Sequence, residues 1–201
     1  EAGSAEALEK PLSYLRHELG AKFDQAKVRM YLTHAPRMVE FFRRQTALQF
    51  IDGNAIPDFH GNTPDAAFGG RSVCAAHFDG RRLGAHMARL KPPMPQTTLW
   101  GMGIASGAEL RHFMNALHSA ASFWYVTKLV LRHWADLLLH GRGMRLVNGN
   151  ALVAALAASA LAKGVELRTG SPAKRLITEQ GTVVGAVLAG ADAEQTVHAR
   201  C

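Results

Sequence analysis

The chain has 201 residues, of which 48% are hydrophobic and 19% charged, a composition that indicates a globular protein and excludes a disordered chain. The formal net charge is +7, but lysine and arginine are scattered and no zinc-finger, RNP or KH pattern accompanies them, so we expect a solvated basic surface and no nucleic-acid binding. Two cysteines are too few for a disulfide framework and favour a reduced, cytoplasmic setting.

No membrane span is expected. The first ten residues are polar and lack the apolar segment of a signal peptide. The most apolar long stretch, 123–139, contains Lys128, Arg132 and Asp136, which makes it a poor transmembrane candidate. Because these three residues recur every four positions, they predict one polar stripe on a largely buried helix of a soluble protein.

Three helices are predicted in the first zone, which runs from residue 4 to residue 46. Pro11 is expected to open the first helix and Gly20 to end it, because proline is favoured in the first turn and glycine just after the last. The second helix is expected over 23–32. The third is expected over 36–45, again opened by a proline.

The second zone, 48–107, is predicted to be irregular. A short strand is expected at 50–51, turns at 58–64 and 69–71, and an extended proline-rich segment at 91–95. So long a loop region is unusual inside a compact domain, and it indicates a functional loop or a segment that packs on other parts of the protein.

Helices followed by strands are predicted in the third zone. The helices are expected over 107–117, 120–140 and 150–163. The strands are expected over 165–169, over 174–179 and 183–189 as a hairpin around Gly181, and over 196–200. The predicted fold class is therefore α/β, or α+β, with helices as the main regular structure and a small C-terminal sheet.

Few motifs of this sequence point to chemistry. No G-x-G-x-x-G follows a predicted strand, and no P-loop, zinc-protease or nucleophile-elbow pattern occurs. Asn148, Gly149 and Asn150 precede a helix and could bind an anion at its N-terminus, but a turn with Asn150 as N-cap alone explains these residue types and is the favoured interpretation. The ten histidines show no metal spacing, so we expect no metal site and histidines at the surface or the edge of the core. The residues alone indicate an α/β piece of a larger protein.

A family resemblance extends this reading. Its carrying segments are 146–153 (LVNGNALV), 164–167 (GVEL), 171–173 (SPA) and 181–187 (GTVVGAV). In this order they resemble the FAD-dependent family that contains 3-ketosteroid dehydrogenases and the flavoprotein subunits of fumarate reductase and succinate dehydrogenase.

The upstream segments are similar to the ketosteroid dehydrogenase branch. They are 35–39 (APRMV), 57–60 (PDFH), 69–72 (GGRS) and 78–84 (FDGRRLG). The branch is expected to have a tyrosine after the aspartate of the second segment. Here that residue is Phe59, which has no hydroxyl to donate, and no other catalytic residue is assigned.

The resemblance implies that residues 1–201 are an internal piece of an interrupted FAD-binding domain, with a helical and loop region over 1–142 and a helix and hairpin segment over 143–201. It implies a flavoprotein oxidoreductase that transfers hydride between FAD and an organic substrate, either ketosteroid-like or a dicarboxylate. Ala173 is expected to lie nearest the FAD adenine through its backbone, and Gly149 is the second expected cofactor-binding residue.

Two further expectations follow. The chain alone is not expected to hold FAD, because it lacks the glycine-rich turn that binds pyrophosphate at a helix N-terminus; its partners would be a small-molecule substrate and the rest of the same polypeptide. The alternative is a helical protein-interaction module without enzymatic activity, which would use the helix over 120–140.

Overall fold

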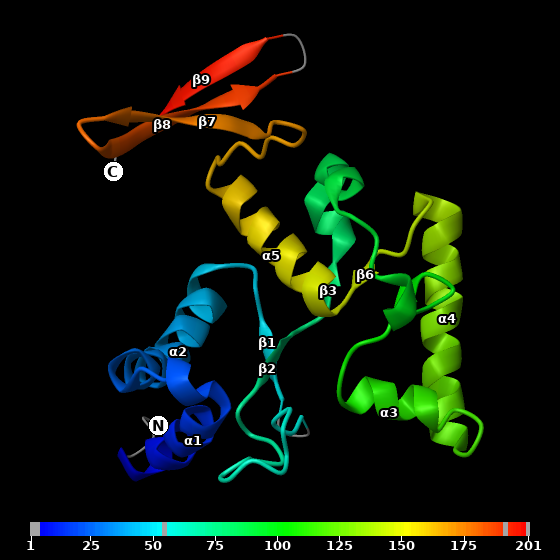
Figure 1. Cartoon of the computed structure of the whole chain (residues 1–201). Helices are drawn as coiled ribbons and strands as arrows, with labels where there is room; N and C mark the ends of the chain where they lie inside the picture. The colour runs from blue at the N-terminus through cyan, green and yellow to red at the C-terminus, as the bar shows by residue number, and fades with distance from the viewer. Residues whose placement is uncertain (1–4, 54–55, 191–192, 200–201) are drawn as a thin grey trace. The chain divides into compact units, whose positions relative to one another are not determined.

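The computed structural model describes residues 5–53, 56–190 and 193–199 and divides into two compact units (Figure 1). The first unit ends at Ala162 and the second begins at Lys163. All the helices of the described residues lie in the first unit, and a three-stranded sheet forms the second. This confirms the predicted mixed fold with a small C-terminal sheet. The subdivision between residues 142 and 143 stays a prediction.

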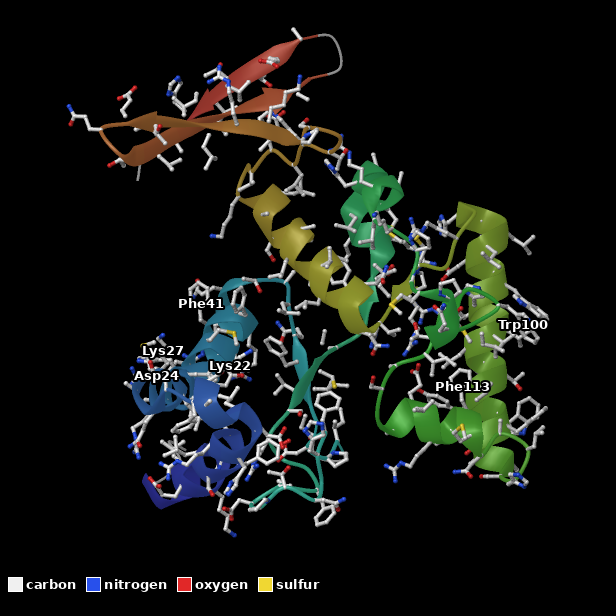
Figure 2. All side chains as sticks on the ribbon, viewed as in Figure 1. Lys22, Asp24, Lys27, Phe41, Trp100 and Phe113 are labelled. Carbon is white, nitrogen blue, oxygen red and sulfur yellow. The ribbon has the colours of Figure 1, made fainter. Side chains whose placement is uncertain are left out.

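The first unit begins with two helices that pack against each other, α1 (Ala5–Leu19) and α2 (Gln25–Gln45). A short 3₁₀ turn, η1 (Gly20–Lys22), joins them. The side chain of Asp24 caps α2 by accepting hydrogen bonds from the backbone of Ala26 at 3.0 Å and of Lys27 at 3.1 Å (Figure 2). The predicted end of the first helix at Gly20 is confirmed.

The predicted roles of the two prolines in this region are wrong. Pro11 lies inside α1, and Pro36 lies inside α2, so the second and third predicted helices are one helix. An interior proline removes one backbone hydrogen bond and costs about 3 kcal/mol. Each helix continues through its proline and buries an apolar residue, Leu12 in α1 and Val28 in α2, and such burial can offset a local penalty.

Short antiparallel strand pairs and 3₁₀ turns make up most of the middle zone. Phe50 and Ile51 do lie in a strand, as predicted. The pairs are β1 (Phe50–Asp52) with β2 (Val73–Ala75), β3 (Phe78–Asp79) with β6 (Arg145–Leu146), and β4 (Thr98–Leu99) with β5 (Met102–Gly103). The 3₁₀ segments are η2 (Gly80–Arg89) and η3 (Pro95–Thr97).

Three helices complete the first unit: α3 (Ala108–Met114), α4 (Ala120–His140) and α5 (Asn148–Ala162). The bounds of α4 are those predicted. Ser119 caps its start by accepting from the backbone of Ser122, and Gly141, with a φ of +71°, ends it. None of the helices in the described part of the chain combines the length and apolarity that crossing a membrane requires.

The core of the first unit lies where α5 packs on β2, β3, β6 and η2. The small side chains of α5 allow its backbone to approach these elements closely. The buried residues of this core are Leu48, Phe78, Leu83, Met87, Met144, Leu146, Ala151, Ala154 and Ala155. This packing sets the place and direction of the N-terminal end of α5.

The second unit is one antiparallel sheet with the strand order β7 (Ala173–Glu179), β8 (Thr182–Ala189), β9 (Glu194–His198). Gln180 and Gly181 both have positive φ angles, 48° and 81°, as a two-residue type I′ hairpin requires. The predicted hairpin is confirmed. A Cβ at Gly185 would lie 2.4 Å from the Val197 carbonyl oxygen, so only glycine lets β8 and β9 approach this closely.

Two strand predictions need correction. Residues 165–169 belong to no sheet in the described part of the chain, because an extended β-rich segment becomes a strand only when a neighbour pairs with it. The last strand covers 194–198 and so starts two residues earlier than predicted. Residues 200 and 201 lie outside the described part of the chain.

Candidate functional site

The start of α5 borders a cavity of the first unit with a volume of about 370 Å³. Val147 and Asn150, on either side of the predicted cofactor-binding position Gly149, line it. The other lining residues come from the loop before α3, the second half of α4 and the segment before α5: Pro92, Pro93, Trp100, Gly101, Met102, Gly103, His133, Leu137, Gly141, Arg142, Gly143, Arg145 and Leu146.

The position of Gly149 is not crowded by other elements. It is the second residue of α5, and no atom of another described element lies within 4 Å of the position that a Cβ would take. The backbone at Gly149 is therefore not covered by side chains from elsewhere in the described structure.

The two asparagines beside Gly149 hold loops and do not cap the helix. Asn148, whose φ is +51°, donates from Nδ2 to the carbonyl of Ile104 at 2.8 Å and accepts at Oδ1 from the backbone of Ser106 at 3.2 Å. Asn150 donates to the carbonyl of Lys91 at 2.8 Å. The predicted N-cap role of Asn150 is wrong, because α5 begins at Asn148 and the Asn150 amide faces a loop.

His133 forms one wall of the cavity. It is 6% exposed, and its Nε2 lies 3.2 Å from the carbonyl oxygen of Trp100. A Cβ at Gly143 would lie 2.7 Å from its Nδ1, so glycine is needed there. The ring of Trp100 contacts that of Trp134 on α4, with 6.0 Å between centroids.

The carboxylate of Glu109, a buried residue of α3, accepts hydrogen bonds from several groups near the cavity. The two terminal nitrogens of Arg145 both donate to it, Nη1 at 3.2 Å to Oε1 and Nη2 to Oε2. The backbone of Ala105 donates to Oε1 at 2.7 Å, and the hydroxyl of Tyr125 donates to Oε2 at 3.2 Å. Burial, and then the neighbouring Glu109 carboxylate, raise the pKa of Tyr125 above its usual value.

A second arginine beside the cavity is also engaged with protein groups. Arg142 donates from Nη1 to the carbonyl oxygens of Met87 at 2.9 Å and Leu90 at 3.0 Å. With Arg145 paired to Glu109, the charged groups beside this cavity are held by the protein, and much of the remaining lining is apolar.

The three predicted site residues lie on separate elements. Gly149 starts α5, and Phe59 lies in the loop between β1 and β2 and is not among the residues that line the cavity. Ala173 is the first residue of β7, in the second unit, where its backbone pairs with Leu188. Their assignment to the cofactor or the substrate stays a prediction.

Several polar residues that shape the site were not predicted from the sequence. The expected polar stripe on α4 is wrong, because Asp136 is buried whereas Lys128 and Arg132 are exposed. His133 lies in the interior, and not at the surface or core edge. The available signal was the presence of polar residues such as His133 and Asp136 within the apolar sequence of α4, which could have indicated buried polar contacts. Among the described residues, no group of three or more potential metal ligands occurs.

Comparison with known proteins agrees with this geometry. The chain belongs to the family of FAD binding domains, whose model matches residues 1–200. The crystal structure of 3-ketosteroid delta1-dehydrogenase from Sterolibacterium denitrificans in complex with 1,4-androstadiene-3,17-dione is similar to it, with a TM-score of 0.81 and 28% identity, over 94% of this chain and 35% of that one. The predicted resemblance to the flavoprotein family is confirmed, and a free-standing interaction module is not favoured.

Two curated relatives are similar in sequence. The 4-oxocyclohex-2-ene-1-carboxylate 5-dehydrogenase of Sinomonas cyclohexanicum is 31% identical over 179 residues, which are 89% of this chain and 30% of that protein. The 3-oxosteroid 1-dehydrogenase of Comamonas testosteroni is 24% identical over 204 residues, which are 99% of this chain and 35% of that protein. The chain thus spans about a third of the length of these relatives.

Proposed function

We propose that this chain supplies part of the FAD-binding domain of a dehydrogenase that oxidises a ring ketone. The observation that carries the proposal is the family match over residues 1–200, supported by the similarity to a ketosteroid dehydrogenase structure. The names of both curated relatives describe dehydrogenation of a ring that bears an oxo group. In such a reaction a proton leaves the substrate and FAD takes the hydride.

The chemistry of the cavity favours a ring ketone over a dicarboxylate. Two substrate carboxylates would need cations free to pair with them. Arg145 is instead paired with Glu109, and Arg142 donates to backbone carbonyls. The apolar lining from Trp100, Met102 and the residues around them suits a ring system.

The residues of this chain fit FAD at two places. The open backbone of Gly149 allows close approach of a planar group at the first turn of α5. The exposed start of β7 at Ala173 offers backbone N–H and C=O groups, which are suited to the adenine edge. Phe59 has no hydroxyl, so it donates no hydrogen bond and moves no proton at the position where the resemblance expects a tyrosine.

Anaerobic mixing of the flavin-loaded full-length protein with substrate tests this function. A ring ketone such as a 3-oxosteroid should remove the absorbance of oxidised flavin, whereas succinate should leave it unchanged. A protein purified without FAD, or a flavin that only succinate reduces, would contradict the proposal.

Two accompanying proposals concern the chain alone and its setting. Residues 1–201 produced alone should bind FAD more weakly than about 1 μM, roughly 8 kcal/mol, as calorimetric titration would measure, because no glycine-rich turn follows a strand in the sequence. We also propose a cytoplasmic location, a small-molecule substrate and the rest of the polypeptide as partners, and no nucleic-acid binding.

A further inference from the structure

One face of α4 is apolar and open to solvent. Trp124, Leu131 and Leu138 recur every seven residues, so they share a face of the helix. Thr127 and Trp134, which are also seven apart, each follow one of these residues by three positions. We call this set the outer seam of α4: Trp124, Thr127, Leu131, Trp134 and Leu138. Its four large apolar residues are between 48% and 88% exposed, and it lies on the side of α4 away from the buried His133.

The spacing of the outer seam is that of a helix that packs against another helix. Apolar residues at alternating intervals of three and four keep one side of a helix toward a neighbour along its length. In the described part of the chain α3 packs against α4, yet the outer seam stays in water. Contiguous apolar surface of this kind marks an interaction site in a soluble protein. The outer seam therefore suits an apolar helix that lies along it.

An exposed tryptophan connects the outer seam with the cavity. The ring of Trp100 contacts that of Trp134, and Trp100 also lines the cavity. Trp100 lies in the tight turn between β4 and β5 with a φ of +50°, and it is 68% exposed. Both the left-handed backbone and the hydrated ring are unfavourable for a tryptophan. A segment that covers the ring would offset both penalties.

Two cations beside the outer seam indicate the chemistry of its partner. Lys128 and Arg132 are exposed on α4, and among the described residues neither forms an ion pair. A second copy of the chain docked by the same face would bring the cations of both chains together, which is unfavourable. A helix whose apolar stripe is flanked by Asp or Glu would pair with them.

We propose that the outer seam of α4 is covered by an apolar helix, flanked by acidic residues, from the part of the same polypeptide outside residues 1–201. The chain aligns with only 30% and 35% of the length of the two curated relatives, so a full-length protein of similar size has ample chain to supply this helix. The covering helix also contacts the ring of Trp100 and so fixes one wall of the cavity.

Zero-length cross-linking of the flavin-loaded full-length protein tests the partner and its charge. A carbodiimide joins a lysine amine to a carboxylate that touches it. We expect Lys128 to be linked to an Asp or Glu outside residues 1–201, in peptides from the monomer band of a denaturing gel. Lys174 and Glu194, 2.9 Å apart, are the positive control. A Lys128 link that occurs only in a dimer band, a link confined to residues 1–201, or no link beside a recovered control would overturn the proposal.

Hydroxyl-radical footprinting of the same protein tests whether the outer seam is covered, without any substitution. Trp124 and Trp134 should be oxidised several-fold more slowly in the native protein than after thermal unfolding, because the covering helix excludes water and radicals from both rings. Mass spectrometry of the digested protein assigns the oxidation to each tryptophan. Rates close to those of the unfolded protein would show that the outer seam faces water in the full-length protein and would overturn the proposal.

Two neighbouring leucines give a matched pair of variants. Leu138 belongs to the outer seam, whereas Leu139, which is also largely exposed, lies about 100° further round the helix. In the full-length protein Leu138→Gln should lower the melting temperature by several degrees, because it places an amide in the covered interface. Leu139→Gln should change it by less than about 1 °C. Equal shifts would contradict the proposal. None of these readouts uses substrate, so they are independent of the test of the proposed function.

Discussion

The helices α4 and α5 of the first unit turn opposite kinds of side chain toward the protein. The buried residues of α4 are polar, namely Ser122, His133 and Asp136, whereas several of its large apolar residues, such as Leu138 at 88% exposed, face outward. The buried residues of α5 are alanines 151, 154 and 155. One helix is therefore held by directional hydrogen bonds and the other by close packing.

The difference matches what each helix does for the cavity. Polar groups of α4 fix segments that adjoin very short strands: His133 contacts the carbonyl of Trp100, and Asp136 accepts from the backbone of Met144 at 3.0 Å. Close packing of α5 on β3 and β6 instead fixes the position of its first turn and of Gly149. Buried polar groups of α4 thus position neighbouring segments by hydrogen bonds, and small side chains of α5 position that helix by close packing.

The largest loss of stability should come from removing a buried polar group of α4. Asp136 is 2% exposed and accepts from Met144 and, at 2.5 Å, from Arg81 Nη2. Asp136→Ala leaves both donors without this acceptor and should lower the free energy of unfolding by about 3 kcal/mol, as measured by urea denaturation. Lys128→Ala, on the exposed part of the same helix, should change it by less than about 0.5 kcal/mol. Equal effects would contradict the account.

A larger side chain in the interface of α5 tests whether close packing positions this helix. Ala154 is 0% exposed in the core, so Ala154→Leu must push α5 away from its neighbours and should cost about 2 kcal/mol. The control Val153→Leu changes an exposed neighbour on α5 and should be nearly neutral in the same denaturation experiment. If Ala154→Leu were tolerated as well as the control, close packing would not be what places α5.

A smaller effect is expected where α4 meets Glu109. Tyr125→Phe removes one hydrogen bond of 3.2 Å and should cost about 1 kcal/mol, whereas Tyr31→Phe, at an exposed position, should cost nothing measurable. Because the pKa of Tyr125 is raised in the folded protein, its contribution is full below the pKa of unfolded tyrosine, about 10, and is lost as pH rises through the folded value. Stability of the parent that falls no faster with pH than that of the variant would contradict this.

Local signals predicted much of the regular structure. The apolar pattern over 120–140 predicted α4, and the turn at Gly181 predicted the hairpin. The two proline predictions were wrong because tertiary burial outweighed a local penalty. The strand over 165–169 was wrong because pairing, which a single segment cannot encode, decides whether an extended segment becomes a strand.

Less of the candidate site could be predicted from the sequence. Gly149 stood out because a turn before a helix has a recognisable pattern, and Phe59 stood out only through the family resemblance. The pair of Glu109 and Arg145 joins residues 36 positions apart, and neither residue is unusual for its predicted element. Their relation is created by the packing of α3 against α4 and by the pairing of β3 with β6.

The most direct measurement is the stoichiometry of flavin reduction in the full-length protein under anaerobic conditions, with identification of the product. We predict that one equivalent of a ring ketone is consumed for each FAD reduced, and that the product carries a new carbon–carbon double bond next to the carbonyl group. Reduction of FAD without a new double bond, or a full-length protein that carries no FAD, would contradict the central claim that this chain belongs to a ring-ketone dehydrogenase.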